Sequence, residues 1–130
     1  MKTTKINPWP NPIFHDAGIL IEGHRRMLFL NGQCAVLPDG QSSHVGDMRA
    51  QMMSALDNLE AVLAQAGMTF ADVVWMNTYV TDIDEFNARV AEPLAERLAR
   101  FDVRPPGVLS CVKALARPEL LIELQMIAAD

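Results

Sequence analysis

The first regular pattern along the chain is a set of apolar residues that recur at three- and four-residue steps. This spacing places apolar side chains on one face of a helix and polar side chains on the other. Gly67 follows the last apolar residue, and glycine is common just beyond the end of a helix. The pattern predicts an amphipathic helix over 47–66. Its apolar face consists of Met48, Met52, Leu56, Leu59, Leu63 and Ala66.

A second helical pattern follows residue 82. Asp82 or Asp84 can cap its start, because an aspartate side chain accepts hydrogen bonds from the free N–H groups of the first turn. Pro93 lies inside the pattern, where a proline removes one hydrogen bond and bends the axis. A helix that restarts at Pro93 is the alternative, but we expect one kinked helix because the apolar positions stay in phase. The apolar positions are Phe86, Val90, Leu94, Leu98 and Phe101.

Apolar and β-branched runs predict the strands. The first two runs flank a turn that contains Gly23 and are expected to pair as a hairpin. The last run carries a carboxylate, Glu123, on the same face as the apolar Leu121 and Ile127. A charged group in an otherwise apolar strand requires a specific role. The predicted strands are 19–21, 27–30, 73–80, 108–115 and 120–128.

The predicted order of elements is β-β-α-β-α-β-β. This order is typical of an α+β fold that has one sheet with both helices on one face, so the other face must also be covered. The proline-rich segment 7–12 fits neither a helix nor a central strand and is expected to form an N-terminal arm. With 130 residues, the chain has the length of a single domain over 1–130.

Charge and hydropathy exclude several classes of function. The formal net charge is -5 and the longest basic run is Arg25-Arg26, whereas nucleic-acid binding requires a basic face. No apolar run approaches the roughly 18 residues that cross a bilayer, and the first residues lack the apolar core of a leader peptide. We therefore expect a cytoplasmic protein that binds neither nucleic acid nor membrane.

Cysteine and histidine spacing gives no sign of a metal site. The two cysteines, Cys34 and Cys111, form neither a C-x-x-C motif nor a disulfide framework. His15, His24 and His44 lie far apart and never at the i, i+4 spacing of paired ligands on a helix. We expect reduced thiols and no bound metal.

Several short blocks of the sequence match one known family in residues and spacing. Residues 31–33 (Asn-Gly-Gln) are similar to a Ser-Gly-Gln segment of that family, and 110–112 (Ser-Cys-Val) to the end of its Pro-x-Arg-Ser-Cys-Val segment. The other blocks are LDNL at 56–59, AG at 66–67, ADVV at 71–74, YVTDIDEF at 79–86, IEL at 122–124 and IA at 127–128. From about residue 27 to the C-terminus, the chain resembles the reactive-intermediate deaminase family, RidA/YjgF.

The resemblance implies a chorismate mutase-like fold that assembles as a homotrimer, with the sheets facing a central core and three clefts between subunits. It also implies hydrolysis of enamines and imines made by pyridoxal-phosphate enzymes, such as 2-aminoacrylate, to a 2-oxo acid and ammonia. The implied partner is a small-molecule metabolite, and no cofactor or metal is implied. In the usual site of the family, an arginine clamps the substrate carboxylate and a late-strand glutamate positions or activates water.

The resemblance implies which residues of this sequence correspond to the functional residues of the family. Glu123 matches the glutamate and is the expected catalytic residue, while Cys111 matches the cysteine. Asn31 replaces a serine, and Phe14 lies near the position of a family tyrosine. The arginine has no counterpart, because Leu109 occupies its place. The candidate substrate-binding residues are Phe14, Asn31, Gly32, Leu109 and Cys111.

Several of these residues have a structural alternative. Cys111 is expected to be a pocket wall and not a nucleophile, because no histidine base is fixed nearby by spacing. Glu123 could instead pair with an arginine across a subunit interface. A substitute for the missing carboxylate clamp could come from Arg104, Lys113 or Arg117.

Two functions from different classes follow. One is a RidA-like enamine or imine hydrolase with an altered substrate, in which Glu123 orders water. The other is a non-catalytic trimeric small-molecule-binding protein that lost the reaction together with the arginine; endoribonuclease activity is a weaker alternative because the chain is acidic. The isobutyl group of Leu109 cannot solvate a carboxylate. We therefore expect low activity on 2-aminoacrylate and a ligand that is neutral, larger or anchored by another cation.

Overall fold

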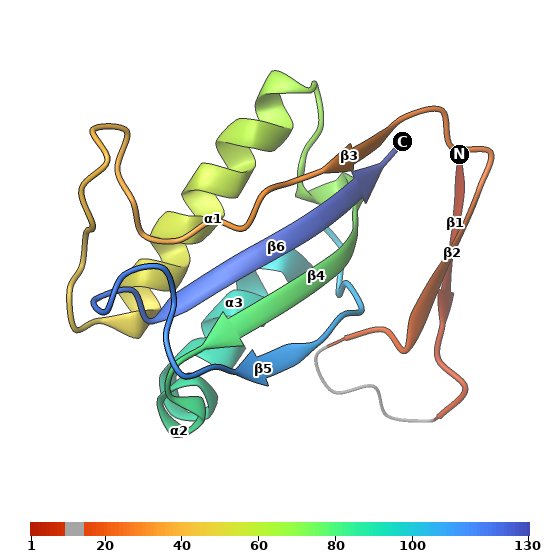
Figure 1. Cartoon of the computed structure of the whole chain (residues 1–130). Coiled ribbons are helices and arrows are strands. Elements are labelled where there is room, and N and C mark those ends of the chain that lie inside the picture. Colours follow the sequence, from red (N-terminus) through yellow and green to blue (C-terminus); the bar gives the residue numbers. More distant parts are fainter. Residues whose placement is uncertain (10–14) are drawn as a thin grey trace.

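The structure is a computed structural model and describes residues 1–9 and 15–130. Its main sheet has four strands in the order β3-β6-β4-β5. Figure 1 shows the long helices behind this sheet, on one of its faces, as the sequence predicts for an α+β fold. No helix in the described ranges is long and apolar enough to cross a membrane. The strands of this sheet span Met27–Phe29 (β3), Ile122–Ala129 (β6), Val73–Val80 (β4) and Leu109–Cys111 (β5).

The first helix, α1, spans Met48–Gln65, as the apolar spacing predicts. The side chain of Asp47 accepts a hydrogen bond from the Ala50 N–H at 3.0 Å and so caps the N-terminus. Gly67 follows the C-terminus with a φ of 72°, a conformation that a residue with a Cβ adopts only under strain. The buried face of α1 packs against β6 and supports the strand that carries Glu123.

The second helical segment differs from the predicted kinked helix. It consists of α2 (Ile83–Glu85), a π-helical turn η2 (Phe86–Val90) and α3 (Ala91–Ala99). Asp82 caps the start by accepting a hydrogen bond from the Glu85 N–H at 3.0 Å. The irregularity precedes Pro93, which lies in the first turn of α3. The wide π turn accommodates the proline ring, which would clash with the carbonyl four residues earlier in a regular helix.

The predicted hairpin at Gly23 is wrong. β1 (Lys2–Ile6) and β2 (Gly18–Glu22) form a separate two-stranded antiparallel sheet, and β3 pairs with β6 instead. The chain crosses between the sheets after β2, where the N–H groups of residues 25 and 26 both donate to the carbonyl of Asp130. The expected single sheet is thus corrected to two, because each strand finds its partner far away in the sequence.

The remaining elements agree with prediction more closely. β4 has the predicted bounds, and the 3-10 turn η1 (Phe70–Asp72) leads into it. β5 is shorter than the predicted 108–115 because it is an edge strand that pairs only with β4, in parallel. Residues 7–9 of the predicted N-terminal arm are irregular, and the rest of that arm lies outside the described residues.

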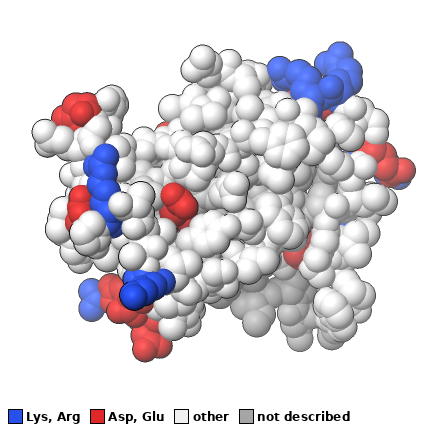
Figure 2. Space-filling view, viewed as in Figure 1, with Lys and Arg blue, Asp and Glu red and all other residues white. Residues whose placement is uncertain are grey.

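The face of the main sheet opposite the helices carries a row of apolar side chains. Phe29, Ile127 and Trp75 stand side by side on β3, β6 and β4. The side chain of Phe29 is 70% exposed. Figure 2, which looks onto this face, shows charged groups mainly at its margins. In the isolated chain this apolar row is therefore in contact with solvent.

Candidate functional site

Glu123 projects from β6 toward the open face of the sheet. Its neighbours along the strand, Ile122 and Leu124, are fully buried against the helices, and side chains alternate between faces along a strand. The Glu123 carboxylate is partly buried, and the thiol of Cys34 donates a hydrogen bond to its Oε1 at 3.3 Å. One carboxylate oxygen is therefore held by the segment that follows β3.

Gly32 lies directly against the same carboxylate. A Cβ placed at Gly32 would stand 2.9 Å from Cδ of Glu123 and 3.1 Å from its Oε2. Cβ atoms do not approach other heavy atoms so closely, so a side chain at this position would displace the carboxylate. The group that lies closest to the backbone at Gly32 is therefore the side chain of Glu123.

Hydrogen bonds fix the position of this segment over the sheet. The backbone of Gln33 donates to and accepts from the backbone of Leu124, at 2.8 and 3.0 Å. The side-chain amide of Asn58, on α1, donates to the carbonyls of Cys34 and Val36 at 3.0 and 3.1 Å. Because the segment is tied to both the sheet and the helix, the thiol of Cys34 stays in reach of Glu123.

Cys34 contacts the candidate catalytic residue Glu123, although the sequence pattern did not indicate it. Burial, followed by the hydrogen bond and the negative charge of Glu123, raises the pKa of the Cys34 thiol to about 12. The thiol is therefore protonated at neutral pH and acts as a hydrogen-bond donor. The spacing from Gly32 could have indicated Cys34. Alternate residues of an extended segment share one side, so the residue two positions after Gly32 is expected on the same side.

Leu109 lies on the opposite face of the sheet from Glu123. β5 pairs with β4 so that Leu109 is the partner of Thr78 and Ser110 is the partner of Tyr79. Tyr79 is also the partner of Glu123 on β6. Partners across strands share a face, so Leu109 and Thr78 face the helices while Tyr79 and Glu123 face away. Within one chain these two predicted site residues do not meet.

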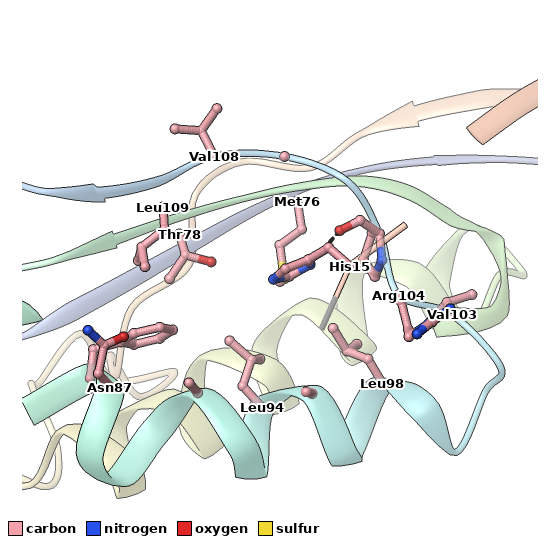
Figure 3. Close-up of a pocket in the computed structure, with 15 residues that line it drawn as sticks. His15, Met76, Thr78, Asn87, Leu94, Leu98, Val103, Arg104, Val108 and Leu109 are labelled. Carbon is pink, nitrogen blue, oxygen red and sulfur yellow. Dashed lines mark hydrogen bonds between the residues drawn. The ribbon is translucent and has the colours of Figure 1, made fainter. Parts of the chain in front are cut away.

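Leu109 borders a cavity of about 340 Å³ between α3 and the β4–β5 edge of the sheet (Figure 3). Cys111 lies two residues further along β5 and is exposed. The polar side chains of Thr78 and Asn87 also line the cavity, and neither was identified from the sequence. The apolar part of the lining includes Met76, Phe86, Leu94, Leu98 and Val103.

None of the three candidate substitutes for the family arginine takes its place. Arg104 lines the cavity, but its guanidinium pairs at 3.3 Å with Asp16, whose side chain is fully buried. Arg117 donates to a carbonyl and a hydroxyl of the loop 40–42, at 2.8 and 3.0 Å. Lys113 is exposed after the end of β5. Among the described residues, none of these three cations therefore stands at the end of the cavity next to Leu109.

The other predicted site residues are placed as follows. Asn31 is exposed and precedes Gly32, on the same side of the sheet as Glu123. Phe14 lies outside the described residues. Among the residues that the structure describes, no three His, Cys, Asp or Glu side chains gather as metal ligands. The candidate residues thus fall into two groups, one around Glu123 and one around Leu109, on opposite faces of one sheet.

Comparison with known proteins identifies relatives that cover most of the chain. A family model described as endoribonuclease L-PSP matches residues 18–130. DfrA of Myxococcus xanthus is 37% identical over 126 residues, which are 96% of this chain and 87% of that protein. The 2-iminobutanoate/2-iminopropanoate deaminase of Escherichia coli is 32% identical over 107 residues, with 78% of each chain covered.

A solved structure agrees with the fold over nearly the whole length. The crystal structure of YyfB from Yersinia pestis, a protein of the Rid family, matches with a TM-score of 0.78, 31% identity and 99% of each chain covered. Sequence and fold therefore give the same assignment. The chain belongs to the YjgF/RidA family, whose family model carries the description endoribonuclease L-PSP.

Proposed function

We propose that the protein is a RidA-like enamine or imine hydrolase with an altered substrate. The observation that carries this proposal is the Glu123 carboxylate, which is held by Cys34 at 3.3 Å and packed against the backbone at Gly32. A carboxylate fixed in this way can accept a proton from water. The deaminase of Escherichia coli that acts on 2-iminobutanoate and 2-iminopropanoate, at 32% identity, supports the same class of reaction.

In the proposed reaction, Glu123 takes a proton from water while the water oxygen bonds to the carbon of the C=N group. The nitrogen takes this proton from Glu123, which gives a tetrahedral amino alcohol, and the hydroxyl proton then passes to the nitrogen. The C–N bond then breaks, ammonia leaves, and the carbonyl group forms. An enamine first accepts a proton on carbon and loses one from nitrogen, which gives the imine. One water is consumed and one ammonia is released, so the reaction requires no oxidant or reductant.

The cleft is proposed to form between subunits of a homotrimer. Leu109 and Glu123 face opposite sides of the sheet, so a cleft that uses both must combine two subunits. The apolar row of Phe29, Ile127 and Trp75 supports burial of the open faces in the centre of such an assembly. The occupant of this face is a second and a third copy of the chain.

The assembly is tested by sedimentation equilibrium at micromolar concentration, where the mass of a trimer is expected. Trp75→Glu places a charge in the proposed core and should shift the protein toward the monomer. Val45→Glu is the matched control, because Val45 is 69% exposed and lies on a loop away from the sheet. A stable monomer, or an equal effect of both variants, contradicts the trimer.

The reaction is tested with a panel of imines and enamines, both neutral and carboxylated, made in situ by a coupled enzyme. Glu123→Gln keeps the shape of the side chain and removes the base, so it should abolish turnover while the assembly stays intact. Pyruvate release from 2-aminoacrylate should be slow. Turnover that survives in Glu123→Gln would remove this residue from the mechanism.

A non-catalytic binding protein is the second candidate. The apolar Leu109 at the position of the family arginine favours it, because the charge that would hold a carboxylate is missing. The two candidates differ in the panel assay, since a binding protein retains ligands without releasing ammonia. Endoribonuclease activity is the weaker alternative because the net charge of -5 opposes binding to a phosphate backbone.

A further inference from the structure

The ionisable side chains at one end of the cavity beside α3 already have partners. Nδ1 of His15 donates to the carbonyl of Pro105 at 2.8 Å, and Arg104 pairs with the buried Asp16. Moving Arg104 away would leave a fully buried carboxylate without its counter-charge, which is costly. Figure 3 shows His15 and Arg104 at the end of the cavity remote from Leu109. The end at Leu109 has no cation among the described residues that line it.

The polar groups near Leu109 are neutral. Thr78 is the strand partner of Leu109 and is only 4% exposed, so its hydroxyl belongs to the floor of the cavity. Asn87 lies opposite, on the helical side, and is exposed at the rim (Figure 3). Figure 3 draws no hydrogen bond between either side chain and another lining residue. An amide and a hydroxyl can both donate and accept, so this pair suits an uncharged polar group.

The space between the two ends is apolar. Met76 projects from the sheet, and Leu94 and Leu98 project from α3 toward it (Figure 3). The volume of about 340 Å³ is near the lower end of the roughly 300–1,000 Å³ that small-molecule pockets occupy. A three-carbon substrate would leave much of this apolar lining without contacts. A carboxylate bound here would lose its hydration and gain no cation.

We propose that this cavity selects an uncharged ligand with an apolar body, aromatic or branched aliphatic. The body lies along Leu94 and Leu98, and a neutral carbonyl or amide group binds Asn87 and Thr78. As a statement about substrate, namely neutral imines and enamines, the inference rests on the proposed hydrolase function. As a statement about binding, it stands on the cavity alone.

The test compares two probes of nearly equal shape that differ in charge, phenylacetamide and phenylacetate. Their affinities for the full-length protein are measured by calorimetry and by NMR titration at neutral pH. The unmodified protein should bind the amide at least about tenfold more tightly, because a hydrogen bond to a neutral partner is retained while the carboxylate loses its solvation. Shifts are expected for the side chains of Asn87 and Leu109.

Two substitutions should change this preference in different ways. Asn87→Ala should weaken amide binding about two- to tenfold and leave the weak carboxylate binding unchanged. Leu109→Arg should strengthen carboxylate binding about ten- to a hundredfold and so reverse the preference. Val45→Arg is the matched control, because it adds the same charge at a residue that is 69% exposed and does not line the cavity, so it should bind both probes like the unmodified protein. Thermal unfolding verifies that each variant is folded.

Each possible outcome of these experiments either supports or contradicts the inference. Equal binding of the two probes, binding of neither at millimolar concentration, or an unchanged preference in Asn87→Ala overturns the inference. A preference for the amide without any hydrolysis in the panel assay leaves the inference standing and rejects the hydrolase. Hydrolysis that depends on Glu123 but favours carboxylated substrates supports the hydrolase and rejects neutral imines and enamines as its substrates.

Discussion

The thiol of Cys34 donates a hydrogen bond to the carboxylate of Glu123 at 3.3 Å. The two residues are 89 positions apart in the chain, and the pair forms only because the segment after β3 is bonded to β6. Burial and the contact with Glu123 both favour the protonated thiol, because only a protonated thiol can donate to the carboxylate. The reactivity of Cys34 therefore reports on the state of Glu123.

The first prediction concerns the reaction of Cys34 with iodoacetamide in a Cys111→Ser background. The thiol should react very slowly at pH 8, because its pKa is raised to about 12 and the thiolate is the nucleophile. Glu123→Gln removes the negative charge that disfavours the thiolate, so alkylation should become faster. The rate is followed by mass spectrometry. Equal rates with Glu and Gln at position 123 contradict the contact.

The same pair predicts a dependence of stability on pH. The pKa of Cys34 rises from 9.0 in the unfolded chain to about 12 in the folded one. The protonated thiol therefore contributes stability that is fully present below pH 9 and is lost as the pH rises from 9 toward 12. The midpoint of thermal unfolding should fall less steeply between pH 9 and 11 in Cys34→Ala than in the unmodified protein. Parallel curves would show that Cys34 makes no such contribution.

The third prediction concerns Gly32. A Cβ at this position would stand 2.9 Å from Cδ of Glu123, so Gly32→Ala should displace the carboxylate. The atoms that must move are the end of a flexible side chain, so the loss of unfolding free energy should be about 0.5–1.5 kcal/mol, the cost of leaving a preferred rotamer. Gly18→Ala is the control, since the added Cβ would meet its nearest atom at an ordinary 3.7 Å. Denaturant unfolding measures the difference between the variants. In Gly32→Ala, the alkylation of Cys34 should also accelerate, because its acceptor has moved away.

The fourth prediction concerns Gln51, a fully buried polar residue of α1. Its amide nitrogen donates to the carbonyls of His44 and Glu119, and its oxygen accepts the N–H of Leu121 at 2.8 Å. Gln51→Leu would leave these backbone groups unpaired, at about 1–3 kcal/mol for each group that remains buried. Gln65→Leu, at the exposed end of the same helix, should change stability far less. Equal unfolding curves for the two variants would contradict the role of Gln51.

Local pattern predicted the elements whose structure depends on near neighbours. The apolar spacing and Asp47 define α1 because a helix closes its hydrogen bonds within a few residues. β4 was also predicted with its full bounds, since its β-branched run is buried on one face. The prediction of a hairpin at Gly23 was wrong because strand pairing depends on residues far away in the sequence. A turn residue shows that the chain reverses, but it carries no information about which distant strand completes the pairing.

In the candidate site too, some features could be predicted from local sequence and others depend on distant contacts. The sequence indicated Glu123, Gly32 and Leu109 as residues of interest, and its family blocks placed the chain in the YjgF/RidA family. It could not show that Cys34 holds Glu123, because that contact joins two segments that only the sheet brings together.

By itself, the sequence determined α1, the presence of a second helical segment after residue 82, the bounds of β4, the family and the absence of an arginine at position 109. The tertiary structure alone decided that Leu109 and Glu123 face opposite sides of the sheet. It also decided that Leu109 opens onto a cavity with the neutral groups of Thr78 and Asn87. The physical reason is register: the face of each side chain follows from the alignment of β5 and β6 on β4, and a shift of one residue would reverse it.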